Sequence, residues 1–109
     1  MPRGSSRKWI TVPQSRVFEY VAAQAARSGF IERVILFGSR ARGQERTFSD
    51  YDLGVELTPG TSQITWLAFA ERLDDEAPTL CQLSLVQLKP SIRSELSRIE
   101  AEGAVIYER

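Results

Sequence analysis

Apolar residues recur at helical spacing in the first part of this chain. Pro13 suits the first turn of a helix, and Ser28-Gly29 ends the pattern. The apolar positions that fall on one face between them are Val17, Tyr20, Val21 and Ala25. The pattern predicts a helix over residues 13–28 with a single buried face.

Two strands are predicted next, joined by a short connection. The run Arg33–Phe37 is rich in β-branched and aromatic residues, which favours a buried strand. Over residues 50–57 polar and apolar residues alternate, so that Asp50, Asp52 and Glu56 share one face of the strand. The second strand is therefore expected to have one acidic and one apolar face.

The remaining pattern predicts a helix, a strand, a second helix and a short final strand. The first of these helices ends before Pro78, and its core face is expected to hold Ile64, Leu67, Ala68 and Leu73. A strand over residues 83–88 follows. The second helix begins at Pro90 and ends at Gly103, with a core face of Ile92, Leu96 and Ile99. The last strand is predicted over residues 104–107. This order predicts an α/β (α+β) fold, a small mixed β-sheet flanked by helices.

The composition excludes several kinds of site. Histidine is absent from the 109 residues, and Cys81 is the only cysteine. No triad or dyad that uses imidazole, no zinc site containing histidine and no internal disulfide can be built within this sequence. Any metal ion would have to be held by oxygen ligands.

Positive charge is concentrated at the start of the chain. Lysine and arginine (14) balance aspartate and glutamate (14), but four basic residues precede the first acid, Glu19. Residues 1–12 are expected to form a basic N-terminal arm and residues 13–109 a single domain. Because basic and aromatic residues do not interleave further along the chain, we expect a solvated arm and no direct nucleic-acid binding. No apolar run has the length of a signal peptide or a membrane span, which predicts a cytoplasmic protein without a membrane contact.

The clearest chemical signal begins with a Gly-Ser turn after the first predicted strand. Gly38 allows a phosphate to approach the backbone closely, and the Ser39 hydroxyl and neighbouring amides can donate to it. Arg40 and Arg42 add charge-assisted donors. The segment lacks the Lys-Ser/Thr of a P-loop and the GxGxxG of a dinucleotide fold. It predicts a different phosphate-binding turn.

Two aspartates follow this turn after a spacer of ten residues. Asp50 and Asp52 are two apart on a strand, so their carboxylates share a face, roughly 6.5 to 7 Å apart, and can reach the same ion or ion pair. Oxygen-only ligation beside a phosphate site indicates Mg²⁺ or Mn²⁺. Two carboxylates that share divalent ions are typical of phosphoryl and nucleotidyl transfer.

Gly38-Ser39, ten residues and Asp50-x-Asp52 together resemble the signature of the DNA polymerase β-type nucleotidyltransferase superfamily. The wider runs over residues 36–43 and 49–53, and the ending over residues 99–107, resemble its smallest members, the minimal nucleotidyltransferase (MNT) proteins. The resemblance implies a nucleotidyltransferase fold that binds an NTP, expected to be ATP, together with Mg²⁺ or Mn²⁺. It also implies transfer of NMP, expected to be AMP, to a hydroxyl with release of pyrophosphate.

The resemblance assigns roles position by position. Asp50 and Asp52 would be catalytic and would hold the metal. The nucleotide-binding positions would be Gly38, Ser39, Arg40 and Arg42. MNT proteins typically pair with an all-helical HEPN protein, act as antitoxin to that partner's RNase and in some members adenylylate a tyrosine of it. A HEPN-type partner, and a homo- or hetero-oligomer, are therefore expected here.

This chain departs from the family in the third predicted strand, where the family places a third carboxylate. The matching residue is Ser84, which cannot ionise. If the strand register were different, Asp75 or Glu76 could supply the acid. Glu56 could also substitute, although it lies roughly 13 Å from Asp52 along the strand. The sequence therefore leaves two hypotheses: an active nucleotidyltransferase, or a weak or inactive MNT-fold module that neutralises a HEPN toxin by forming a complex.

Overall fold

The computed structural model describes residues 13–46, 48–89 and 93–109. Within these ranges the chain forms three helices and four strands, which follow one another in the predicted order. The elements are α2 (Gln14–Ser28), β1 (Ile31–Phe37), β2 (Tyr51–Leu57), α3 (Gln63–Asp75), β3 (Leu83–Gln87), α4 (Arg93–Glu102) and β4 (Ala104–Glu108). The predicted basic arm (1–12), Pro90 and Ile92 lie outside the described residues.

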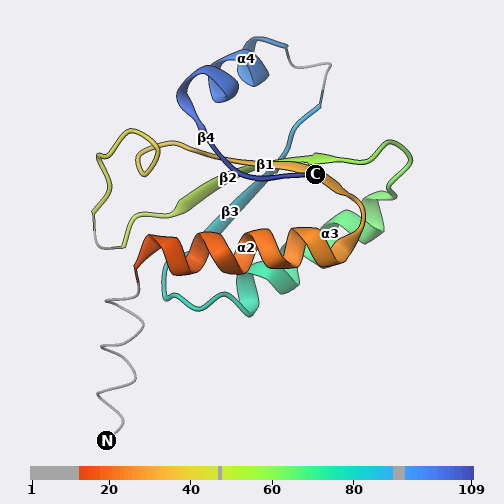
Figure 1. The fold of residues 1–109 in the computed structure, drawn as a ribbon, viewed down its shortest axis with the longest axis horizontal. Helices are drawn as coiled ribbons and strands as arrows, with labels where there is room; N and C mark the ends of the chain where they lie inside the picture. Colours follow the sequence, from red (N-terminus) through yellow and green to blue (C-terminus); the bar gives the residue numbers. More distant parts are fainter. Residues whose placement is uncertain (1–12, 47, 90–92) are drawn as a thin grey trace, which may run out of the picture.

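The four strands form one mixed sheet in the order β3-β2-β1-β4. Strand β1 is antiparallel to both of its neighbours, β2 and β4, whereas β2 and β3 are parallel. Helices α2 and α3 cover one face of the sheet, and α4 lies on the other (Figure 1). This arrangement confirms the predicted α+β fold with a small mixed sheet.

The main core lies between the sheet and the pair α2 and α3. Val17, Val21 and Ala25 are buried along one face of α2, as the spacing predicted. Tyr20, on the same helix, donates a hydrogen bond from its hydroxyl to the Leu73 carbonyl oxygen at 2.8 Å. Leu73 lies in the last turn of α3, where backbone carbonyls have no partner within the helix. The bond from Tyr20 therefore gives the Leu73 carbonyl a partner and joins α2 to α3.

The predicted core face of α3 is wrong at three of its four positions. Leu73 is buried, but Ile64 and Leu67 are 82% and 58% exposed, and Ala68 is also exposed. The buried residues of the helix are Trp66, Phe69 and Leu73. This helix has apolar residues on two faces, and the face with the two large aromatic rings packs on the sheet because it removes more apolar surface from water.

The strand boundaries differ from the prediction by one or two residues. Strand β1 begins at Ile31 and not at Arg33, and β2 begins at Tyr51, so Asp50 directly precedes the strand. On the far face of the sheet, Ile99 of α4 is buried against Ile35, and Leu96 packs on the same cluster. No helix among the described residues is long and apolar enough to cross a membrane.

Candidate active site

The Gly-Ser segment forms a tight turn directly after β1. Gly38 has a φ of +76°, a left-handed conformation that side chains disfavour. The turn is closed by backbone hydrogen bonds from Arg42 N to Gly38 O at 3.2 Å and from Gln44 N to Ser39 O at 2.8 Å. The segment that follows β1 is therefore a hydrogen-bonded turn.

Asp52 lies directly against this turn. In the antiparallel pairing of β1 and β2, Asp52 is opposite Phe37, the residue before Gly38. A Cβ atom placed on Gly38 would collide with Asp52 Oδ2 and would lie 3.0 Å from its Cγ. Glycine is therefore required at position 38 for two reasons. Its positive φ disfavours a side chain, and the Asp52 carboxylate occupies the space that a side chain would need.

The two aspartates act on one another electrostatically. The pKa of Asp52 is raised, first by the burial of its carboxyl and then by the negative charge of Asp50, while Arg42 lowers it. Asp50 itself is exposed. The structure therefore places Asp52 at the turn, within the electrostatic influence of Asp50 and Arg42.

Ser84 lies beside Asp52. The parallel pairing of β2 and β3 places Ser84 opposite Asp52, on the neighbouring strand. The two alternatives from the sequence lie elsewhere: Asp75 ends α3 and Glu76 is its C-cap, and both are exposed. Glu56 is in an ion pair with Arg33 at 3.2 Å. Over the described ranges there is no group of three or more acidic, cysteine or histidine side chains placed to hold a metal.

The two arginines of the turn lie in different surroundings. Arg42 is exposed, and its Nε donates to Gln44 Oε1 at 3.2 Å. Arg40 is buried and donates to the Ser49 carbonyl oxygen, so its guanidinium is not with the carboxylates. The sequence pattern contained no signal for this difference, because both residues follow the same turn.

Comparison with known proteins assigns the family. A family model described as polymerase beta, nucleotidyltransferase, matches residues 20–109. The chain belongs to this nucleotidyltransferase family. A search of curated proteins found no match.

Solved structures of other proteins share the fold of this nucleotidyltransferase. A chain in a toxin–antitoxin complex with AMP-PNP superposes with a TM-score of 0.68 at 17% identity, covering 84% of this chain and 73% of that one. A complex of tri-AMPylated HEPN toxin with MNT antitoxin from Shewanella oneidensis gives 0.66 at 15% identity, with 89% and 74% covered. A candidate nucleotidyltransferase from Sulfolobus solfataricus gives 0.59 at 19% identity, with 97% and 86% covered. At these identities the likeness shows the fold.

The donor set of this site fits a divalent cation. Burial and the negative charge of Asp50 disfavour the charged form of the Asp52 carboxyl. A hard cation bound between Asp50 and Asp52 would offset both effects, and the Ser84 hydroxyl lies on the neighbouring strand. The residues present therefore suit Mg²⁺ or Mn²⁺. They supply two carboxylate ligands, where the family resemblance implies three.

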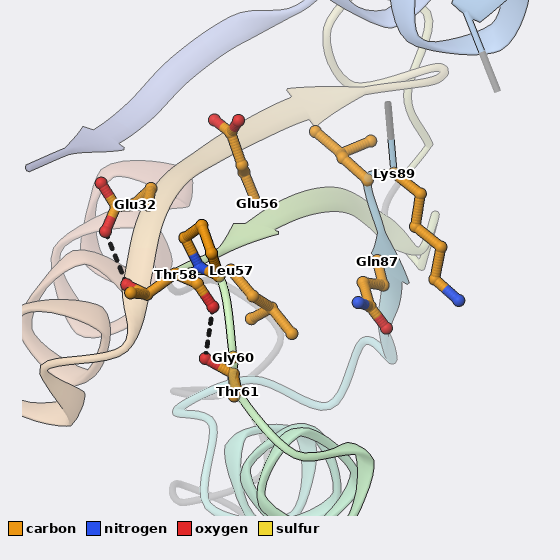
Figure 2. Close-up of a pocket in the computed structure, with 10 residues that line it drawn as sticks. Glu32, Glu56, Leu57, Thr58, Gly60, Thr61, Gln87 and Lys89 are labelled. Carbon is orange, nitrogen blue, oxygen red and sulfur yellow. Dashed lines mark hydrogen bonds between the residues drawn. The ribbon is translucent and has the colours of Figure 1, made fainter. Parts of the chain in front are cut away.

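A separate pocket of about 570 Å³ lies at the other end of β2 in this nucleotidyltransferase. Figure 2 shows Gln87 and Lys89 on one side of the pocket and Glu32, Glu56 and Thr58 on the other. Strand β2 runs from Tyr51 to Leu57, and the pocket begins at Glu56. It is therefore distinct from the site formed by the aspartates and the Gly-Ser turn.

Proposed function

We propose that this protein transfers a nucleoside monophosphate, AMP in the first instance, from an NTP to a hydroxyl group of a partner protein. The observation that carries the proposal is the placement of Asp52 against Gly38, with Asp50 acting on it electrostatically. This arrangement supports a divalent-cation site formed by the two acids beside a turn suited to a phosphate chain. The family assignment over residues 20–109 supports the same reaction.

Each residue of the site has a proposed role. Asp50 and Asp52 hold Mg²⁺ or Mn²⁺, and the Gly38-Ser39 turn with the Ser39 hydroxyl binds the β- and γ-phosphates. Arg42, which is exposed near Asp52, adds a charge-assisted donor for the triphosphate. Arg40 has no part in this contact because its guanidinium is used inside the protein.

The reaction needs only these groups and the substrates. When bound, a cation held by Asp50 and Asp52 would neutralise charge on the phosphates and would lower the pKa of the acceptor hydroxyl. The acceptor oxygen forms a bond to the α-phosphorus while the α–β phosphoanhydride bond breaks. Pyrophosphate leaves with the electron pair, and the proton of the hydroxyl passes to water. Ser84 cannot take that proton as a third carboxylate would.

We further propose that the acceptor belongs to a HEPN-type toxin and that this chain is its antitoxin. The fold is shared with a chain of a complex between an AMPylated HEPN toxin and an MNT antitoxin, which supports the pairing. AMP-PNP is present in a second complex of this fold, which supports a nucleotide as ligand.

One observation favours a second candidate function. Ser84 lies in the strand position beside Asp52, where the family resemblance implies a third carboxylate. A chain with two carboxylates could bind the nucleotide and the toxin but transfer AMP slowly. In that case it would neutralise the toxin by forming a complex with it.

The experiment that separates the two candidates uses ATP labelled at the α-phosphate. The purified protein is incubated with Mg²⁺ and labelled ATP, with and without a HEPN-type helical protein, and Asp50→Asn is the control. Label on the partner that disappears with Asp50→Asn would establish nucleotidyl transfer. A tight complex without label would refute the transferase proposal and leave the binding antitoxin.

A further inference from the structure

Arg40 is the only charged side chain that is buried among the described residues, with a relative exposure of 9%. It follows Ser39 in the turn, yet its guanidinium points away from the proposed phosphate site. A buried guanidinium keeps its charge and requires partners for its donors. Its partners therefore indicate what the residue does.

The guanidinium holds the peptide group directly before Asp50. Nε and Nη2 of Arg40 both donate to the Ser49 carbonyl oxygen, at 3.0 and 2.8 Å. This oxygen belongs to the peptide bond that joins Ser49 to Asp50. Because β2 begins only at Tyr51, Asp50 lies outside the strand pairing that fixes Asp52. The contact with Arg40 therefore restrains a backbone segment that the sheet does not restrain.

The same guanidinium also packs on the residue between the two aspartates. Its central carbon lies 3.9 Å from the centroid of the Tyr51 ring. Tyr51 is 2% exposed, and its ring makes an edge contact with Phe18 of α2 at 5.9 Å between centroids. Since Tyr51 points to the apolar face of β2, Arg40 contacts the Asp-x-Asp segment from the side opposite to the carboxylates.

We propose that Arg40 is a positioning residue, which fixes Asp50 relative to Asp52 and so sets the separation of the two metal ligands. The proposal rests on the proposed function, in which both aspartates hold the divalent cation. It joins the two halves of the motif physically, because one side chain from the Gly-Ser turn fixes the acidic segment. It also explains why an arginine suits the position: a planar fork can bind one carbonyl with two donors and stack flat on a ring at once, and a lysine cannot.

The test measures metal binding without turnover. Mn²⁺ affinity is measured by electron paramagnetic resonance for wild type, Arg40→Lys and Arg40→Met, first without and then with ATP. Thermal melts establish that each variant is folded, and Arg40→Lys, which keeps the charge and most of the stem, carries the test if Arg40→Met does not fold. Arg46→Lys, an exposed arginine in the same connection, is the matched control. Arg42→Met tests the other arginine of the turn.

We expect Arg40→Lys to weaken Mn²⁺ binding about 10- to 100-fold, the usual effect of removing a residue that orients metal ligands. Arg46→Lys should match wild type, and Arg42→Met should weaken Mn²⁺–ATP binding more than binding of Mn²⁺ alone. Wild-type Mn²⁺ affinity in a folded Arg40→Lys would overturn this inference and leave the proposed function intact. If Arg40→Lys lost only ATP affinity, Arg40 would be a phosphate ligand and the inference would also fail. A wild-type chain that binds neither Mn²⁺ nor Mn²⁺–ATP would refute the proposed function, and the inference with it.

Discussion

The carboxylate of Asp52 fills the space in which a side chain at Gly38 would begin. This single relationship joins the end of β1 to the start of β2 and brings the predicted phosphate turn and the predicted metal ligand together. Neither residue can change without affecting the other. The following predictions start from this pair and extend to its neighbours.

Replacing Gly38 by alanine should damage both stability and ligand binding. A φ of +76° costs about 1 to 2 kcal/mol for a residue with a side chain, and the new methyl group would also displace Asp52. We expect a lower melting temperature and weaker binding of Mn²⁺–ATP, measured by thermal melts and calorimetry. Gly60→Ala is the control, since its φ of +90° is also left-handed but nothing lies within 4 Å of the added carbon. Equal ligand affinity in Gly38→Ala and Gly60→Ala would contradict the prediction.

Asp52→Asn should stabilise the metal-free protein at neutral pH while removing the response to cations. Burial and the charge of Asp50 raise the pKa of Asp52, so the folded state disfavours the carboxylate. The resulting penalty is absent below the ordinary pKa of an aspartate and grows as the pH rises through the raised value. The gain in melting temperature from Asp52→Asn should therefore shrink on acidification. Added Mn²⁺ should raise the melting temperature of wild type only, and the same rise in the variant would argue against a site at Asp52.

Ser84→Asp should strengthen the site. Ser84 is paired with Asp52 on the adjacent parallel strand, so an aspartate there would add a third carboxylate beside the first two. We expect Mn²⁺ affinity to increase about tenfold or more, and labelling of the partner to become faster. Ser84→Asn, which has nearly the same shape without the charge, should do neither. If Ser84→Asp behaved like Ser84→Asn, the third-carboxylate interpretation of this position would be wrong.

Tyr20→Phe should destabilise the protein and reduce its sensitivity to alkaline pH. Loss of the hydrogen bond to the Leu73 carbonyl should cost about 1 kcal/mol in urea unfolding at neutral pH. Burial is the largest cause of the raised pKa of Tyr20, so the folded state keeps its hydroxyl protonated to a higher pH than the unfolded chain does. The stability that Tyr20 contributes in this way is complete below pH about 10 and is lost as the pH rises through its raised pKa. When the pH is raised above 10, the free energy of unfolding should therefore fall less in Tyr20→Phe than in Tyr107→Phe. Equal falls in the two variants would contradict this prediction.

The sequence predicted the element order because period and turn residues are local properties. The face of α2 could be read from Val17, Val21 and Ala25, because no large apolar residue lies on the opposite side of the helix. On α3 the spacing of Ile64 and Leu67 was equally regular, but Trp66 and Phe69 bury more surface and determine the rotation of the helix. A pattern alone does not weigh one apolar face against another.

The candidate site was predictable in its members and not in its internal contacts. Spacing was enough to pair Asp50 with Asp52 and to place Ser84 on the third strand. The direction of Arg40 depends on the Ser49 carbonyl and the Tyr51 ring, which the fold brings near the turn. No spacing rule distinguishes Arg40 from Arg42, because the surrounding residues determine whether each side chain is buried or exposed to solvent.

The turn and the acidic segment are both part of the single connection between β1 and β2, neighbours in sequence and in the sheet. Residues 38–50, thirteen in all, separate the two strands, which is fewer than separate the other pairs of neighbouring strands, so closing this connection costs less chain entropy than closing the others. By contrast, the pairing of Ser84 with Asp52 requires the parallel crossover connection that contains α3. The pairing of β1 with β4 joins the first strand of the chain to the last. Contacts of short sequence separation form early in folding and distant ones form late. The geometry that binds a phosphate and a cation can thus assemble with the first hairpin, before the domain is complete.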